Sequence, residues 1–158
     1  MLRFALLLIL FIPTVAISEP LDRFAGRYRG CAVSGGEWVP IETTLAVSGN
    51  RLSGSYIFIE SSGRNVNGTI IFESHDGGDS VTLQWRDLYG EGSAAFDFTA
   101  DGSRFDGYWA AESSESRFDW NGVRIGSGRT IPDCRTPISW VQMPRTDPEF
   151  LIARKDKR

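Results

Sequence analysis

Five side chains of types that bind small molecules lie in or beside the segments that join the apolar stretches of the chain. They are Trp38, Arg64, Arg86, Tyr89 and Glu112. An aromatic ring presents a large apolar face, and an arginine guanidinium pairs well with carboxylates and phosphates. We therefore expect Trp38 and Tyr89 to form an aromatic rim, with Arg64 or Arg86 meeting an anionic group of a ligand. The alternative is that all five belong to ordinary solvated loops.

The motifs of common catalytic centres are missing from the sequence. There is no Gly-x-Ser-x-Gly elbow, no cysteine–histidine pairing and no cluster of metal ligands. His75 is the only histidine, and it lies in SHDGGD, a composition typical of a turn. We predict no catalytic residues, no metal and no cofactor.

Three aspartates, Asp97, Asp106 and Asp119, each follow an aromatic residue within an alternating stretch. A glycosidase needs two carboxyl groups about 5–10 Å apart across a cleft. Because successive side chains of a strand point to opposite faces, we expect these aspartates to face water while the rings face inward. A carbohydrate-active enzyme is therefore only a third interpretation.

Period-two alternation of apolar and polar residues runs through the chain after residue 20, without a sustained helical period. It predicts eight strands, at about 25–33, 41–48, 51–59, 66–73, 80–86, 94–100, 104–111 and 118–125. Short connections make neighbouring strands antiparallel. We predict an all-β, eight-stranded up-and-down barrel, because an even strand number lets the last strand pair with the first and leaves no free edge. A two-sheet β-sandwich is the alternative.

The connections of such a barrel alternate between its two ends. Four of them should gather at one end, at 34–40, 60–65, 87–93 and 112–117. They hold or border the five candidate ligand-binding residues. Small barrels bind ligands at a mouth, so we place any ligand site at this end.

A similar sequence motif occurs in two of the expected hairpins: GNRLSGSY at 49–56 and GSRFDGYW at 102–109. In each copy an arginine follows the turn and begins a strand. The second glycine of each copy, Gly54 or Gly107, then lies inside that strand, where glycine permits a bend or a close backbone approach. We interpret the repeat as architectural, and a duplicated binding motif is the alternative.

Three features of the sequence belong together: the opening FAGRYRG, the meander of glycine-punctuated hairpins, and SVTLQW followed by FDGYW and FDW. In these features the chain resembles the calycins, the secreted barrels that include lipocalins and avidins. The resemblance covers roughly residues 24–125, and Gly26-Arg27-Tyr28 stands where lipocalins usually have Gly-x-Trp. It implies a secreted, eight-stranded barrel. No binding residue is carried over from these families, since fold resemblance does not define a site.

The interior of this barrel is expected to be crowded. Large rings that can face inward are Tyr56, Phe58, Phe72, Trp85, Phe96, Phe98, Phe105, Trp109, Phe118 and Trp120. A barrel of eight strands has room for its side chains or for one small ligand. The number of rings favours a filled core, which would make the protein a scaffold, while a hollow one would make it a carrier.

Residues 127–158 lack the alternating pattern of the preceding stretches and contain four prolines, so no regular strand is expected there. Two cysteines in an exported chain suggest one disulfide, Cys31–Cys134. That bond would make the segment an irregular strap over the seam between the first and last strands, with Ile138, Trp140 and Val141 on the outside. Alternatively, Trp140 and Met143 form a patch that docks a partner.

The N-terminus has the pattern of a cleaved signal peptide at residues 1–18. Arg3 precedes an apolar run that Pro13 ends, and Ala16-Ile17-Ser18 supplies small residues at the cleavage site. The run is shorter than the roughly 20 residues that span a bilayer, so we predict no membrane span. We expect export to the periplasm or the extracellular space, with residues 19–126 forming the barrel domain.

Charge argues against a nucleic-acid partner. The formal net charge of the chain is −3, whereas nucleic-acid binding needs a clustered basic face. The basic stretch 154–158 is interpreted as a solvated terminus. The oligomeric state does not follow from the sequence.

Taken together, the residues predict an exported, non-catalytic binding module that takes a small apolar or anionic ligand at the barrel mouth. The alternative is a protein–protein interaction module with a solid core, such as an inhibitor or an envelope accessory. A cavity large enough for a ligand would distinguish the two.

Overall fold

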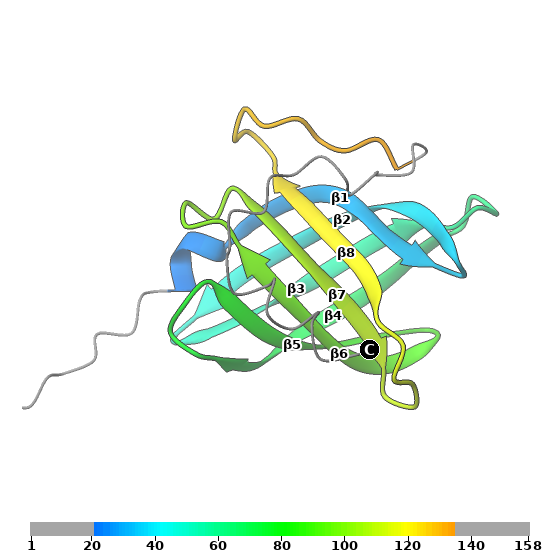
Figure 1. Ribbon diagram of the computed structural model, residues 1–158, viewed down its shortest axis with the longest axis horizontal. Helices are drawn as coiled ribbons and strands as arrows, with labels where there is room; N and C mark the ends of the chain where they lie inside the picture. Colours follow the sequence, from blue (N-terminus) through cyan, green and yellow to red (C-terminus); the bar gives the residue numbers. More distant parts are fainter. Residues whose placement is uncertain (1–20, 135–158) are drawn as a thin grey trace, which may run out of the picture.

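The protein, described over residues 21–134 by a computed structural model, is a closed antiparallel barrel whose eight strands follow one another in sequence order (Figure 1). The elements are η1 (a 3₁₀ turn, Leu21–Phe24), β1 (Gly26–Ser34), β2 (Glu37–Ser48), β3 (Arg51–Ile59), β4 (Asn65–His75), β5 (Ser80–Asp87), β6 (Gly90–Phe98), β7 (Arg104–Ala111) and β8 (Phe118–Arg124). The predicted all-β class and the barrel, rather than the sandwich, are confirmed. The expected signal segment 1–18 and the basic stretch 154–158 lie outside the described residues.

Alternation decides which face of each strand lies inside. In β5 the side chains of Val81, Leu83 and Trp85 are buried, while Gln84 and Arg86 between them are exposed. The same two-residue period recurs in β3, β4 and β6. Closing the sheet turns all the apolar faces toward one interior and leaves no strand edge unpaired.

Two strands begin earlier than the sequence predicted. β2 starts at Glu37 and β6 at Gly90, so the connections before them shrink to 35–36 and 88–89. Gly35 and Gly36 have φ of +61° and +84°, the left-handed conformation that a two-residue hairpin turn requires and that glycine adopts without strain. The proposed loops 34–40 and 87–93 are therefore mostly strand.

The repeated glycines occupy positions where two backbones approach closely. A Cβ atom added to Gly54 would lie 1.9 Å from the carbonyl oxygen of Thr44, and one added to Gly107 would lie 2.1 Å from that of Ala95. Arg51 and Arg104 begin β3 and β7, as predicted. The repeat therefore marks two equivalent hairpins in which the strand must bend against its partner, and the architectural interpretation is supported.

One end of the barrel is filled by stacked rings. Phe24 of η1 stacks on Phe98 with ring centroids 4.2 Å apart, and Phe96 stacks on Phe105 at the same 4.2 Å. The Tyr28 ring meets Phe105 edge-on at 5.3 Å. We call this cluster the aromatic plug. Each such ring buries about 150–250 Å² of surface, so the plug removes a large apolar area from water at this end.

Arg124 closes this end from outside the plug. Its Nη2 donates to the Tyr28 hydroxyl at 3.0 Å and also to the backbone carbonyl of Arg23. The Tyr28 hydroxyl in turn lies 2.8 Å from the carbonyl oxygen of Phe24 and 2.9 Å from that of Gly102. The network ties η1, β1, the β6–β7 turn and β8 together, and it gives the buried tyrosine hydroxyl the partners it needs.

The seam between β1 and β8 closes around Gly30. A Cβ atom there would lie 2.0 Å from the carbonyl oxygen of Asn121, and the Asn121 side-chain oxygen accepts from the backbone N–H of Cys31 at 3.1 Å. Asn121 thus brings its side chain as well as its backbone against β1, between the paired positions Arg29–Val123 and Ala32–Trp120. Only a residue without a side chain fits opposite it.

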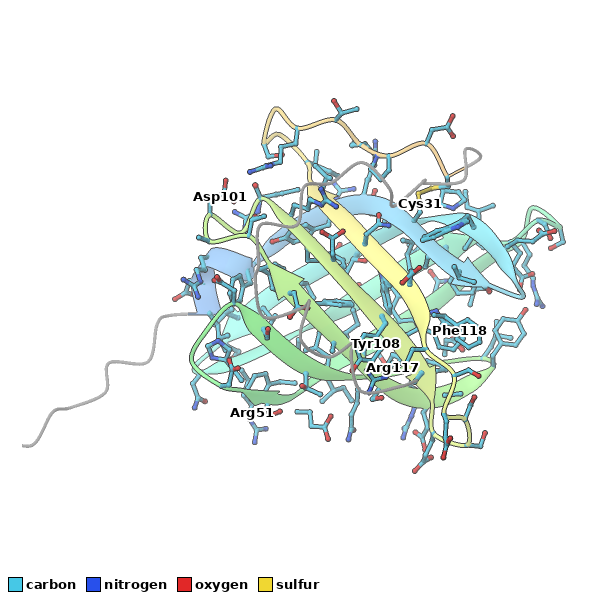
Figure 2. The ribbon with its side chains drawn as sticks, viewed as in Figure 1. Cys31, Arg51, Asp101, Tyr108, Arg117 and Phe118 are labelled. Carbon is cyan, nitrogen blue, oxygen red and sulfur yellow. A yellow bond between two sulfur atoms is a disulfide. The ribbon has the colours of Figure 1, made fainter. Side chains whose placement is uncertain are left out.

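The disulfide Cys31–Cys134 forms, as predicted, and fastens the segment after β8 to β1 (Figure 2). The segment begins where Ile125 N–H donates to the carbonyl of Arg27 at 2.8 Å, and it is irregular as far as Cys134. Cys31 faces outward from the barrel, but this segment covers it, so its side chain is fully buried. Residues 125–134, which we call the strap, are thus joined to β1 by this bond. Ile138, Trp140, Val141 and Met143 lie outside the described part of the chain.

Replacing both cysteines by alanine should lower the free energy of unfolding by about 3–5 kcal/mol. The bond joins residues 103 apart in sequence, and the chain-entropy model assigns about 4.7 kcal/mol to a loop of roughly 100 residues. Urea unfolding of the double variant and of the oxidised parent measures the difference. A loss below about 1 kcal/mol would show that the β1–β8 seam holds without the strap.

Candidate functional site

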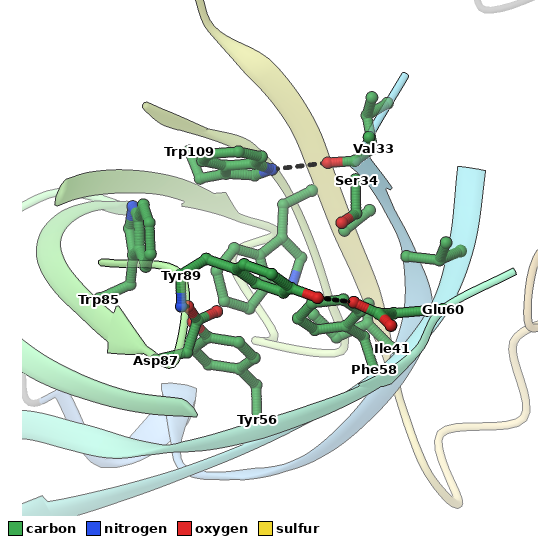
Figure 3. A pocket seen from close by; sticks show the side chains of 14 residues that line it. Val33, Ser34, Ile41, Tyr56, Phe58, Glu60, Trp85, Asp87, Tyr89 and Trp109 are labelled. Carbon is green, nitrogen blue, oxygen red and sulfur yellow. Dashed lines mark hydrogen bonds between the residues drawn. The ribbon is translucent and has the colours of Figure 1, made fainter. Parts of the chain in front are cut away.

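A cavity of about 370 Å³ lies inside the barrel at the end opposite the plug (Figure 3). Its mouth is formed where β1, β3 and β5 end. Its lining consists of Ala32, Val33, Ser34, Gly35, Val39, Ile41, Tyr56, Phe58, Glu60, Trp85, Asp87, Tyr89, Trp109 and Trp120. The expectation of a filled interior therefore holds only for the closed end.

The floor of the cavity is the Trp120 ring. Trp120 packs edge-on against Phe96 of the plug at 5.0 Å and against Tyr56 at 4.8 Å. Its indole N–H donates to Thr43 Oγ1 at 3.2 Å. Because this donor has a partner inside the protein, the ring offers the cavity an apolar face.

Trp85 and Trp109 form the wall on the β5–β7 side. Their rings are nearly perpendicular, at 84°, with centroids 5.3 Å apart. The Trp85 indole N–H donates to the carbonyl of Ala110 at 3.1 Å, and the Trp109 indole N–H donates to the carbonyl of Val33 at 2.9 Å. The second bond reaches from β7 to β1 (Figure 3). Both rings are thus anchored through their polar edges and present carbon surface to the hollow.

Asp87 is the polar group at the inner edge of the mouth. Its Oδ2 accepts from the Tyr56 hydroxyl at 2.8 Å, and its Oδ1 accepts from the backbone N–H of Tyr89 at 2.8 Å. Burial raises the pKa of Tyr56 far above its ordinary value, and the hydrogen bond to Asp87 raises it further. The tyrosine therefore stays protonated and remains the donor.

A second polar group, Glu60 with Arg64 and Tyr89, lies at the outer rim. Arg64 donates to the Glu60 carboxylate through Nε at 3.0 Å and Nη2 at 3.2 Å. The Tyr89 hydroxyl also donates to Glu60 and accepts from Arg64. The Arg64 guanidinium, and then the Tyr89 hydroxyl, lower the pKa of Glu60 from 4.5 to about 2. The rim pair therefore carries one charge of each sign at neutral pH.

The structure brings only part of the predicted ligand set to the mouth. Tyr89 lines the cavity, and Arg64 touches it through Glu60 and Tyr89. Trp38 lies within β2 next to Val39, which faces the cavity, so alternation places Trp38 on the opposite face. The predicted aromatic rim of Trp38 and Tyr89 therefore does not form, because only Tyr89 lines the cavity.

Arg86 and Glu112 lie on the outside of the barrel. Arg86 is exposed and forms an ion pair with Glu91 across the β5–β6 hairpin. Both Arg86 and Glu112 border a depression over β4–β7, which shares Trp85 with the interior cavity. Asp97 and Asp119 are also exposed, as expected, and Asp106 pairs with Arg104 at 2.7 Å.

Sequence reasoning missed Asp87 and Glu60, although the alternation that predicted the strands contained them. Asp87 continues the inward series that includes Leu83 and Trp85, and Glu60 continues the one that includes Phe58. Both fall in the predicted loops 60–65 and 87–93, and a carboxylate in a loop usually faces water. Extending the strand period by one more step would have found them.

The fold and the cavity define an eight-stranded antiparallel barrel, closed at one end and hollow at the other, which is compatible with a calycin-like architecture. No family model matches the chain, and no curated protein is significantly similar to it in sequence.

Within residues 21–134, no helix has the length and apolar character of a membrane span. In the same residues, no group of three His, Cys, Asp or Glu side chains is placed to hold a metal ion.

Replacing Arg64 by Gln should raise the pKa of Glu60 from about 2 toward its ordinary 4.5, because the largest stabilisation of the carboxylate is lost. A folded-state pKa below the ordinary value stabilises the protein above pH 4.5, and this contribution is lost as the pH falls toward 2. Carboxyl-detected NMR against pH measures the titration directly.

Arg51→Gln is the matched control, since Arg51 begins β3 at the closed end of the same barrel. It should leave the Glu60 titration unchanged. A Glu60 pKa near its ordinary value in the parent chain would show that the rim network does not form in solution.

Proposed function

We propose that the protein is an exported, non-catalytic carrier that binds one small, largely apolar ligand in the open-end cavity. The observation that carries the proposal is the cavity itself, which is lined by aromatic and aliphatic side chains with a few polar groups at its mouth. Ligand sites for small molecules usually measure about 300–1,000 Å³ and have this composition. At about 370 Å³ the hollow suits a compact ligand.

The shape of the interior supports a carrier over a solid scaffold. The plug already gives the barrel a dense core at one end. The side chains around the hollow belong to the same core cluster but leave the space between them unfilled, and unfilled space in a protein interior normally reduces stability. A binding role gives this space a use.

Export rests on two features of the chain. The signal-like segment 1–18 precedes the barrel, and the Cys31–Cys134 bond is of a kind that persists in oxidising compartments. We therefore place the carrier in the periplasm or outside the cell.

The alternative, a protein-interaction module, has less support in the described residues. It relied on residues 127–150, most of which lie beyond Cys134. A docking role also gives no reason for an apolar hollow. It becomes the better interpretation if the hollow proves unable to hold a ligand.

Fluorescence titration with N-phenyl-1-naphthylamine, a neutral apolar dye, tests the proposal. We expect saturable enhancement with one dye per chain. Ser34→Phe should weaken binding by about tenfold or more, because Ser34 lines the mouth and a ring there would obstruct it.

Ser55→Phe is the matched control, since Ser55 is exposed on the outer face of β3. It should bind the dye like the parent chain. Equal binding by the Ser34→Phe variant, or no saturable binding by the parent, would overturn the cavity as a ligand site.

A further inference from the structure

We propose that the cavity selects ligands that carry an organic cation, a protonated amine or a quaternary ammonium group, attached to an apolar body. This inference rests on the proposed carrier function and names the ligand class of the same site. The cationic group would lie against Asp87, and the apolar body would extend toward Trp120.

The first support is the charge of Asp87. Two hydrogen bonds fix its carboxylate, one from the Tyr56 hydroxyl and one from the Tyr89 backbone, but neither donor carries a positive charge. Within residues 21–134, no arginine or lysine forms an ion pair with Asp87. A partly buried charge without a counter-ion is unfavourable, so a cation arriving in the cavity would remove an existing penalty.

The rim pair does not supply that counter-ion. Arg64 is held by both oxygens of Glu60, so its charge is already matched. The neighbouring Arg86 lies on the outer face and is paired with Glu91. Of the two carboxylates that line the cavity within residues 21–134, Glu60 is therefore paired with Arg64, whereas Asp87 has no cation beside it.

The second support is the aromatic lining. Trp85, Trp109 and Trp120 have their indole N–H groups bonded inside the protein, so what they present to the hollow is ring surface. The face of a tryptophan ring attracts a cation by about 0.5–2 kcal/mol, more when water is excluded. Trp85 and Trp109 stand nearly at right angles, as two adjoining walls of a cage (Figure 3).

The same charges work against an anionic ligand, which the sequence had suggested. An anion at the mouth would face the Asp87 and Glu60 carboxylates, both of which line the cavity. To be neutralised it would have to displace Glu60 from Arg64. A neutral ligand would meet neither a penalty nor a gain.

Three probes with the same ring system and differing head groups separate these possibilities: 2-(2-naphthyl)ethylammonium, 2-(2-naphthyl)ethanol and 2-naphthylacetate. Each is titrated at pH 7 into the oxidised protein labelled with ¹⁵N-tryptophan. The indole signals of Trp85, Trp109 and Trp120 report occupation of the cavity. We expect the ammonium to bind about tenfold or more tightly than the alcohol, and the acetate to bind most weakly.

Asp87→Asn removes the charge and keeps the shape, and its one amide oxygen can still accept from the Tyr56 hydroxyl, although the bond from the Tyr89 backbone N–H is then lost. It should reduce the affinity for the ammonium to that of the alcohol and leave the alcohol within about twofold of its parent value. Asp119→Asn makes the same change of net charge on the outer face of β8 and should preserve the ammonium preference. The probe comparison uses the unmodified chain, so it stands even if the Asp87 variant does not fold.

The outcomes distinguish the two proposals. If the alcohol or the acetate binds as tightly as the ammonium and shifts the same indole signals, the cavity binds ligands but cation selection is wrong. The same conclusion follows if a folded Asp87→Asn variant keeps the preference. If none of the probes shifts these signals, the carrier function itself is overturned.

Discussion

Closure of the sheet between β1 and β8 is the constraint on which the rest of the structure depends. The two strands are far apart in sequence, and their pairing is what converts a meander with one apolar face into an enclosed interior. Gly30 lets Asn121 approach the β1 backbone, and the Cys31–Cys134 bond holds the covering segment over the same place. Without this seam, neither the plug nor the cavity would have walls on every side.

The interior is dense at one end and hollow at the other because large and small side chains are unevenly distributed along the strands. Near η1, rings from several strands and from η1 itself meet and stack. Near the mouth, β1 contributes the smaller side chains of Ala32, Val33 and Ser34 to the lining, whereas β5 and β7 contribute tryptophans. The indole hydrogen bonds to Val33 and Ala110 then hold those tryptophans at the wall. Collapse into the hollow would break both bonds and leave buried polar groups unpaired.

The sequence was sufficient for the fold because its strongest signals are local. Alternation, turn glycines and the bending positions Gly54 and Gly107 do not depend on knowing distant contacts, and each agrees with the structure. The site was harder to predict, because a side chain's face depends on where its strand begins. Trp38 belongs to the predicted loop 34–40 but lies on the outer face of β2, whereas Asp87 and Glu60 continue the inward series at strand ends. A boundary error of a few residues thus changes which groups meet at the mouth. The hollow itself follows from the packing of many side chains and has no local signal.

The most direct test of a barrel that is closed at one end and hollow at the other is a crystal structure of the oxidised protein under xenon pressure. Xenon enters apolar cavities without needing a particular ligand chemistry. We predict xenon density between Trp85, Trp109 and Trp120, with both wall tryptophans still bonded to the carbonyls of Val33 and Ala110. A structure without xenon there, in which the Trp85 and Trp109 rings have moved against Ala32 and Ile41 to fill the space, would contradict it.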